Sequence, residues 1–404
     1  MIFVGVDWAE AHHDLAVKDA AGKTLAKRRI TDDLEGVRHL HEVLACYTDD
    51  PSEVLIGIET DRGLFVSALR SAGYRVFAVN PFSASRYRDR HSSSGAKSDP
   101  GDAEVLADLV RTDSHNHREI AGDSELVEAV KILARAHKAL IWTRQRQTNS
   151  LRSILREYYP GALAAFADGL NAKQAIEVLL IAPTPELGRG LSRSRIASAL
   201  RRGGRKRSIE ERSTEIQQAL RAPQLEAPAL ISNAFGETVK ALASVIAELS
   251  RQIESLEAEL ASHFDKHPDA KIILSLPGLG TVLGARVLGE FGDDPDRFAS
   301  AKCRKNYAGS SPITRASGTK RVVLARYARN RRLADALYLW AFASLTASPG
   351  ARALYDRHRD AGDSHHQALR ALANRFVGIL HGCLVSGTLY DETVAWETRA
   401  EIAA

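Results

Sequence analysis

An apolar repeat between residues 235 and 260 limits the possible folds more than any other part of the chain. Its apolar residues are spaced alternately by four and three positions, which is the a/d pattern of a heptad repeat. The repeat predicts a long helix with a coiled-coil seam that packs against another helix, in the same chain or in another copy. The seam consists of Phe235, Val239, Leu242, Ile246, Leu249, Ile253, Leu256 and Leu260.

The first 120 residues alternate between short apolar runs and amphipathic segments. Strands are predicted over residues 2–7, 13–19, 23–30, 53–59 and 74–80. Helices are predicted over residues 33–46, 63–72 and 102–113, the first with Leu34, Val37, Leu40 and Leu44 on its buried face. A polar loop is predicted over residues 91–102. This order is typical of an α/β layer arrangement of the ribonuclease-H type.

A chain of 404 residues is expected to form two or three domains. We predict an α/β metal-binding domain over residues 1–120 and a basic helical and coiled-coil connector over 121–267. A mainly helical domain is predicted over 268–404.

Composition excludes several classes of protein. The three cysteines are far apart, which argues against a disulfide framework or a paired-cysteine zinc module and fits the cytoplasm. The N-terminus has no secretory signal pattern, and no run of about 18 apolar residues predicts a membrane span. The net charge of +5 is modest, so clustering of charge carries more information than its sum.

Acidic residues close two predicted strands, at Asp7 and Glu59. Two more acids, Asp99 and Asp102, would share the first turn of a helix with Asp99 at the N-cap and Pro100 at the first helical position. Four converging carboxylates repel one another unless a cation is present, which predicts a site for a hard divalent ion such as Mg²⁺. Acids are also common at helix starts, so each residue alone carries little weight. The neighbouring acids are not assigned to this site: Glu10, Asp14, Asp61, Glu104 and Asp108.

Basic residues gather in three places that we expect to contact nucleic-acid phosphates. One is the polar side of a predicted helix, within residues 131–156. The second contains Arg193, Arg195, Arg201, Arg202, Arg205, Lys206 and Arg207. The third includes Arg315, Lys320 and Arg321. The turn Pro277-Gly278-Leu279-Gly280 before a helix is either a helix-hairpin-helix element that binds phosphate or a simple turn between packed helices.

Serines lie inside the third basic segment, at Ser310, Ser311 and Ser317. Ser317 stands between Ala316 and Gly318, so its hydroxyl could approach a phosphate without obstruction. A serine needs activation to act as a nucleophile. Most serines in basic loops only contact phosphate, and this interpretation stays open for Ser317.

Together these motifs resemble the insertion-sequence one-ten family of transposases, the DEDD transposases guided by a bridge RNA. The resemblance covers almost the whole chain. The acids match in GVDWAE, IGIETD and AKSDPGDAEVLADL, and the C-terminal match lies in LSLPGLGTVLGARVLGEFG and YAGSSPITRASGTKRVV.

The resemblance implies a RuvC-like domain that binds Mg²⁺ through Asp7, Glu59, Asp99 and Asp102. It implies that Ser317 attacks a DNA phosphate and forms a transient phosphoserine link. Donor and target DNA would be selected by a structured noncoding bridge RNA. The family also implies a homo-oligomer, a dimer or a tetramer, in which the two sites combine across subunits.

Two alternative functions remain. A RuvC-like endonuclease that hydrolyses DNA junctions would need the acids and the metal but not Ser317. A non-catalytic nucleic-acid-binding protein would keep the basic segments and tolerate loss of the acids.

Overall fold

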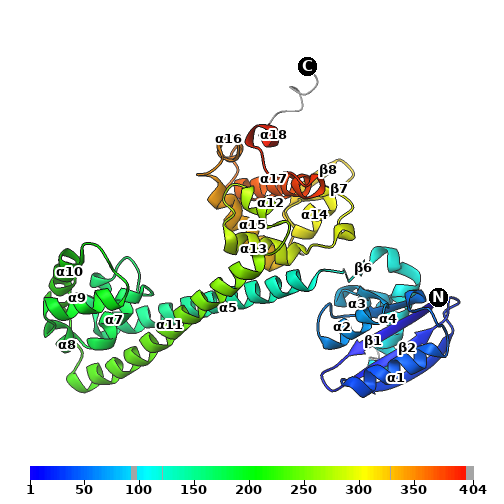
Figure 1. The fold of residues 1–404 in the computed structure, drawn as a ribbon, viewed down its shortest axis with the longest axis horizontal. Coiled ribbons are helices and arrows are strands. Elements are labelled where there is room, and N and C mark those ends of the chain that lie inside the picture. Colours follow the sequence, from blue (N-terminus) through cyan, green and yellow to red (C-terminus); the bar gives the residue numbers. More distant parts are fainter. Residues whose placement is uncertain (92–97, 121, 328, 397–404) are drawn as a thin grey trace. The chain divides into compact units, whose positions relative to one another are not determined.

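The computed structural model describes the chain except for residues 92–97, 121, 328 and 397–404 (Figure 1). The predicted loop over residues 91–102 therefore falls largely outside the described residues. The chain divides into two compact units, Met1–Gly122 and Asp123–Ala404. The predicted domain boundaries at residues 120 and 267 remain predictions.

A six-stranded sheet forms the centre of the first unit, in the order β3-β2-β1-β4-β5-β6. The β1–β2 and β2–β3 pairs are antiparallel, β1–β4 and β4–β5 are parallel, and β6 is antiparallel at the edge. The central strands of the sheet are covered on both faces, so they need apolar side chains on both faces, and the continuous apolar runs meet this requirement. The strands are β1 (Ile2–Trp8), β2 (His12–Lys18), β3 (Thr24–Thr31), β4 (Val54–Ile58), β5 (Arg75–Ala78) and β6 (Arg118–Glu119).

Helices cover both faces of this sheet. The buried side chains of α1 (Leu34–Ala45) and α2 (Leu64–Ser71) pack on one face, and those of α3 (Pro81–His91) and α4 (Asp99–Asp113) pack on the other. The mixed α/β prediction is therefore confirmed for the first unit. One detail is wrong: Leu34 is 86% exposed, because it is the first residue of α1 and lies beyond the edge of the buried face.

Two paired glycines allow α4 to lie directly on the sheet. Gly5 of β1 and Gly57 of β4 are opposite each other in the parallel ladder. A Cβ at Gly5 would come within 1.8 Å of the Ala103 carbonyl oxygen, and one at Gly57 within 2.7 Å of the Leu106 carbonyl oxygen. Only glycine permits this approach, which brings the first turn of α4 toward the ends of β1 and β4.

The second unit is mainly helical and contains two apolar cores. The long helices α5 (Glu125–Tyr158) and α11 (Ala229–Phe264) run antiparallel and contribute to both (Figure 1). The first core also contains α6 (Pro160–Ala165), α7 (Lys173–Ile181), α9 (Arg193–Arg202) and α10 (Ile209–Arg221). The short helix α8 (Pro185–Arg189) lies between α7 and α9 in the chain. The second also contains α12 (Ala270–Ser275), α13 (Thr281–Phe291), α14 (Ala301–Ala308), α15 (Arg331–Ser344), α16 (Pro349–Asp360), α17 (His365–Ser386) and α18 (Glu392–Trp396).

Short elements complete this description. A hairpin of β7 (Ile313–Ser317) and β8 (Lys320–Leu324) follows α14. The 3-10 turns are η1 (Pro51–Glu53), η2 (Ser114–Asn116) and η3 (Pro295–Arg297). Among the described helices, α17 is apolar and long enough to cross a membrane, but a core helix passes the same test. Its side chains at Leu369, Leu372 and Phe376 are fully buried in the second core.

The predicted seam lies on α11, and the helix that packs against it is α5 of the same chain. One half of the seam is buried, with Val239, Ile246 and Leu260 each 0% exposed. The alternate residues Leu242 and Leu249 are only half-buried. The structure thus confirms one long helix, whereas the coiled-coil assignment remains a prediction.

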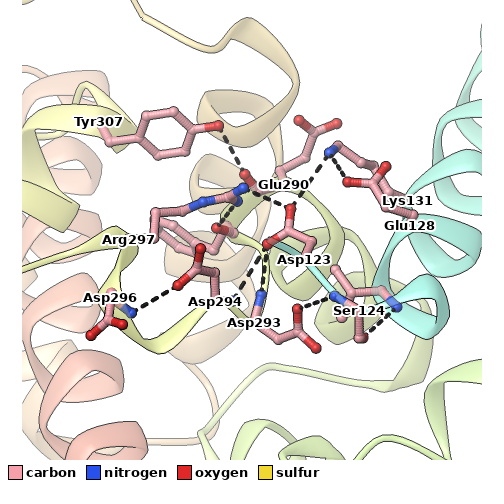
Figure 2. Close-up of polar contacts among 12 residues, drawn as sticks. Asp123, Ser124, Glu128, Lys131, Glu290, Asp293, Asp294, Asp296, Arg297 and Tyr307 are labelled. Carbon is pink, nitrogen blue, oxygen red and sulfur yellow. Dashed lines mark hydrogen bonds and ion pairs between the residues drawn. The ribbon is translucent and has the colours of Figure 1, made fainter. Parts of the chain in front are cut away.

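A buried carboxylate fastens the start of α5 to the segment after α13 (Figure 2). Asp123 accepts hydrogen bonds from the backbone nitrogens of Asp293 and Asp294, at 3.2 and 3.4 Å. The Arg297 guanidinium donates to its other oxygen at 2.7 Å, and the Ser124 nitrogen donates to Asp293 at 2.9 Å. Since Asp123 and Arg297 are both almost fully buried, each supplies the countercharge that the other needs.

Candidate active site

The four predicted acids gather where β1, β4 and α4 begin or end. Val6 is opposite Ile58 in the parallel ladder, so Asp7 and Glu59 leave adjacent strands side by side. Asp102 is buried in the first turn of α4, and Asp99 is exposed in the same turn.

The helix predicted over residues 102–113 begins three residues earlier, at Asp99, and its N-cap is one residue before the predicted one. Ser98, with extended backbone angles, is the N-cap, and Asp99 is already the first helical residue. The Asp102 nitrogen donates to the Ser98 carbonyl at 2.9 Å, which closes the first turn one position earlier than expected. Proline is tolerated at this early position because its missing N–H would be unpaired there anyway.

Asp7 is the most perturbed carboxyl of this group. Its pKa is raised from 3.8 to about 6, first by burial and then by the negative charges of Asp102, Asp99, Glu59 and Asp14. The other three predicted acids therefore all lie close enough to act on Asp7, and so does Asp14. A divalent cation would relieve this repulsion.

Two arginines neutralise part of the charge. Arg29 of β3 donates to both oxygens of Asp14, at 3.1 and 2.7 Å, and also lies 3.8 Å from an Asp99 oxygen. Arg88 of α3 lies 2.6 Å from an Asp102 oxygen.

A potential metal-ligand cluster partly overlaps the predicted acids. One ligand atom each of His12, Asp14 and Asp99 lies within 4.8 Å of the other two. Glu104 and Asp108, which the sequence analysis did not assign to the site, form ion pairs with Lys27 and Lys18.

The β7–β8 hairpin presents Ser317 at its tip. Ser317 is opposite Lys320 across the two-residue turn, where Gly318 takes the left-handed conformation with φ +57°. Directly opposite residues share a face and alternate residues lie on the same side, so Ser317, Lys320 and Arg315 occupy one face. Arg321 is opposite Ala316, on the other face. Both strands are exposed except for half-buried Ile313.

The other serines of this segment have different surroundings. Ser310 is half-buried, and its hydroxyl contacts the Asn374 side-chain oxygen at 3.1 Å. The Ser311 nitrogen donates to the Lys305 carbonyl at 3.5 Å.

The glycine turn before α13 is closely packed on the fold. Gly278 has φ +81°, and a Cβ there would lie 2.6 Å from the Ser344 nitrogen of α15. This explains Gly278 as a packing residue and leaves phosphate binding there a prediction. Gly280 is the N-cap of α13, and a Cβ there would meet open space.

The basic residues of segment 193–207 differ in their partners. Arg201 forms an ion pair with Glu210 and Arg202 with Glu177. Arg205 donates to the Arg207 carbonyl and to Gln174. Among the residues that the structure describes, no carboxylate forms an ion pair with Arg193, Arg195, Lys206 or Arg207, all of which are exposed.

Comparisons with known proteins give the family. A transposase family model, DEDD_Tnp_IS110, matches residues 4–160. A second model, described as the transposase IS116/IS110/IS902 family, matches residues 270–356. The chain is 46% identical to the "Mini-circle putative transposase for IS117" of Streptomyces coelicolor, covering all of this chain and 98% of that protein. The chain belongs to the IS110 family of transposases.

More distant relatives are also full-length matches. The IS900 uncharacterized 42 kDa protein of Mycobacterium paratuberculosis is 31% identical, over 96% of this chain and 97% of that protein. The IS110 uncharacterized 43.6 kDa protein of Streptomyces coelicolor is 27% identical, over 96% and 95%. The family match spans both the acidic centre and the Ser317 hairpin.

Sequence reasoning for this IS110 family member missed Asp14, His12, Arg29 and Arg88. Asp14 is opposite Asp7 in the antiparallel β1–β2 ladder, and the sequence predicted both strands but not the register that pairs these two residues. Nothing in the spacing of Arg29 or Arg88 shows which acid each would contact.

Proposed function

We propose that this protein catalyses DNA strand exchange during the movement of an insertion sequence, using the acids of the first unit and Ser317 of the second. The observation that carries the proposal is the convergence of Asp7, Glu59, Asp99 and Asp102, where burial and the negative charges of the other three acids raise the pKa of Asp7. In a family of DNA transposases, such a cluster is suited to a divalent metal.

A ribonuclease-H-like, RuvC-type fold for the first unit is part of the proposal. Its support is the strand order: three antiparallel strands are followed by two parallel ones, with helices on both faces. The acids then lie at the end of the central strands, where α/β folds bind their ligands.

The residues present fit a divalent ion, because carboxylate oxygens dominate the cluster and their negative charges help to raise the pKa of Asp7. Asp7, Glu59, Asp99 and Asp102 would hold Mg²⁺, with Asp14 and His12 available nearby. The ion would supply charge neutralisation at a phosphodiester and polarise its oxygens. Arg29 and Arg88 keep the carboxylates oriented until then.

Ser317 would attack the phosphorus of a DNA phosphodiester with its Oγ. A serine–phosphate ester bond forms as the strand's ester bond breaks. The serine loses its proton and the released strand oxygen gains one. The number of ester bonds is unchanged, so the link is reversible and the strand can be passed to a second hydroxyl. Lys320 and Arg315 on the same face would stabilise the charged phosphate.

Nucleic acid would be held by exposed basic residues. Arg193 and Arg195 on α9 are the strongest candidates in segment 193–207, since Arg201 and Arg202 are neutralised by glutamates. A noncoding bridge RNA and the donor and target DNA are the proposed partners, and a homo-oligomer is the proposed assembly.

The test is a recombination assay with donor and target DNA, Mg²⁺ and the noncoding RNA flanking the element. Ser317→Ala is compared with wild type and with Ser255→Ala, which removes an exposed serine of α11. We expect Ser317→Ala to abolish both recombination and the covalent protein–DNA band on a denaturing gel, since losing a covalent nucleophile lowers turnover by as much as about 10⁶-fold.

Asp102→Asn separates the alternatives in the same assay. If Ser317→Ala still cuts DNA while Asp102→Asn does not, the protein is a hydrolytic junction endonuclease and the role of Ser317 is rejected. If both variants retain every activity of the wild type, the protein only binds nucleic acid.

A further inference from the structure

A cleft of about 530 Å³ lies at the base of the β7–β8 hairpin, within the second unit. Its walls come from the α14–β7 connection, the end of β8, α16 and α17. We call it the hairpin cleft. Its cationic lining residues are Lys305, Arg326, Arg370 and Arg375.

The hairpin cleft carries more positive than negative charge, because four cations and one carboxylate, Asp363, line it. The Arg375 guanidinium also donates to the Ala395 carbonyl. Among the described residues, no carboxylate forms an ion pair with any of these four cations. Asp363 also lines the cleft, but it accepts a hydrogen bond from His358 at 2.7 Å. The Arg326 Nε atom is buried and has no hydrogen-bond partner among the described residues. Gathered cations in a partly buried cleft are unfavourable without an anion.

Lys305 is held in place by the shape of α17. A Cβ on Gly378 would lie 2.9 Å from the Lys305 Nζ and Cε atoms, so glycine makes room for the lysine to pass across the helix. Burial lowers the pKa of Lys305, and the positive charge of Arg375 lowers it further. An anion bound in the cleft would offset both effects.

The cleft also has apolar lining residues. They are Val323, Leu324, Leu354 and Ala371. The volume falls within the range of sites that enclose one small molecule, and is too small for duplex DNA. Cationic and aliphatic side chains in one cleft suit a single nucleotide, with its phosphate against the cations and its base against the aliphatic groups.

The hairpin cleft and Ser317 lie at the two ends of the β7–β8 hairpin. Ile313 and Leu324 are paired at the base of the hairpin, and Ser317 and Lys320 are paired at the tip. Four residue steps of a strand span about 13 Å. The cleft is therefore separated from Ser317 by a distance that a few nucleotides of one strand can span.

We propose that the hairpin cleft binds one unpaired nucleotide of the DNA strand whose phosphate is attacked at the hairpin tip. Its phosphate lies among Lys305, Arg370 and Arg375, and its base lies against Leu354 and Val323. This nucleotide sets the register of the strand on the hairpin. The assignment of the strand as DNA rests on the proposed function, whereas the nucleotide site rests on the cleft itself.

The test measures binding by the full-length protein in EDTA. Fluorescence anisotropy of a short fluorescein-labelled single-stranded DNA is followed over a salt series. We expect Arg370→Gln to weaken binding by about tenfold. The slope of log K against log salt should become shallower by about 0.7 for each phosphate that the variant no longer neutralises. Lys305→Gln combined with Arg370→Gln should weaken binding further, and Arg370→Lys should recover the slope.

The matched control is Arg357→Gln on α16, an exposed arginine that does not line the cleft. Equal affinity and slope for Arg370→Gln and Arg357→Gln would overturn the proposal. So would a loss confined to RNA of the same sequence, which would make the ligand an RNA nucleotide. Thermal melting of each variant must match wild type. If Arg370→Gln is unfolded, Lys305→Gln is compared instead with Lys302→Gln, an exposed lysine of α14 that does not line the cleft, and equal binding by these two variants would overturn the proposal.

The outcome is independent of the covalent step. Reduced binding in Arg370→Gln without a Ser317 adduct in the wild type keeps the nucleotide site and rejects the proposed nucleophile. A Ser317 adduct with unchanged binding in Arg370→Gln keeps the proposed function and rejects the site.

Discussion

At the level of single residues, Asp7 reflects the state of the acidic centre. Its carboxyl is partly buried and faces the negative charges of Asp102, Asp99 and Glu59, so ionisation in the metal-free protein is unfavourable. Arg29 and Arg88 offset the charge of Asp14, Asp99 and Asp102 but form no ion pair with Asp7. Asp7 is therefore where removal of a charge should be easiest to measure.

We predict that Asp7→Asn stabilises the metal-free protein at pH 8. The folded-state pKa of about 6 lies above the ordinary 3.8, so the folded state binds the proton more tightly. The free energy of unfolding therefore falls as the pH rises from about 4 to about 6. The destabilisation caused by ionised Asp7 is absent below about pH 4. In thermal unfolding with EDTA, the melting temperature of the variant should rise by roughly 3–6 °C for each kcal/mol gained in the free energy of unfolding.

The difference in melting temperature between Asp7→Asn and wild type should shrink toward zero between pH 6 and pH 4, because wild-type Asp7 becomes neutral there. Asp61→Asn is the control, an exposed acid two residues beyond Glu59 that is not among the charges acting on Asp7. A variant that melts at or below the wild-type temperature at pH 8 would show that the acids do not repel one another as the structure indicates.

At the level of elements, the two rows of apolar residues in the α11 heptad differ in how deeply they are buried. Ile246 is fully buried in the core that contains α6, α7, α9 and α10, whereas Leu249 is half-buried. We predict that Ile246→Ala lowers the free energy of unfolding by about 2–5 kcal/mol. Leu249→Ala should cost about 1 kcal/mol, in proportion to the smaller area that it buries. Urea unfolding followed by circular dichroism measures both.

Equal losses in the two variants would mean that the seam is buried as the bare heptad pattern predicts. A loss in Leu249→Ala that grows with protein concentration would instead indicate that a second copy covers the row of Leu242, Leu249 and Leu256.

The sequence allowed the central elements to be predicted because their physical signals are local. The runs around Val4 and Ile56 are apolar throughout, and a strand covered on both faces requires this. The seam of α11 gave the helix but not which side is buried, since that depends on α5, far away in sequence. The β7–β8 hairpin was not predicted, because the exposed residues of both strands carry no apolar alternation and only Gly318 marks the turn.

Residues of the candidate site could likewise be predicted only where their signal is local in the sequence. Asp7 and Glu59 follow apolar strands, and Asp102 follows from the helix start, so all three have a local signal. Asp14 required the register of the β1–β2 pair, which a turn of uncertain length does not fix. The contact of Arg88 with Asp102 depends on how α3 packs beside α4, and spacing along the chain does not indicate that packing.

At the level of the whole molecule, the proposed chemistry is divided between the two units. The acids belong to Met1–Gly122, and Ser317 belongs to Asp123–Ala404. Strand exchange needs both groups at one phosphodiester, supplied either by one copy or by two copies of the chain. Each unit has its own apolar core, so a substitution in one centre should leave the other folded.

We predict that two inactive variants, Asp102→Asn and Ser317→Ala, recover recombination when they are mixed. The Asp102→Asn copy retains Ser317, and the Ser317→Ala copy retains all the acids. If a site uses the acids of one copy and the serine of another, a mixed oligomer therefore contains one intact site. The measurement is product formation and the covalent band in the mixture, compared with each variant alone. The double variant mixed with wild type is the control, and it should only dilute activity. If the mixture of single variants stays inactive while size-exclusion chromatography shows that they assemble together, each copy must supply its own acids and its own serine.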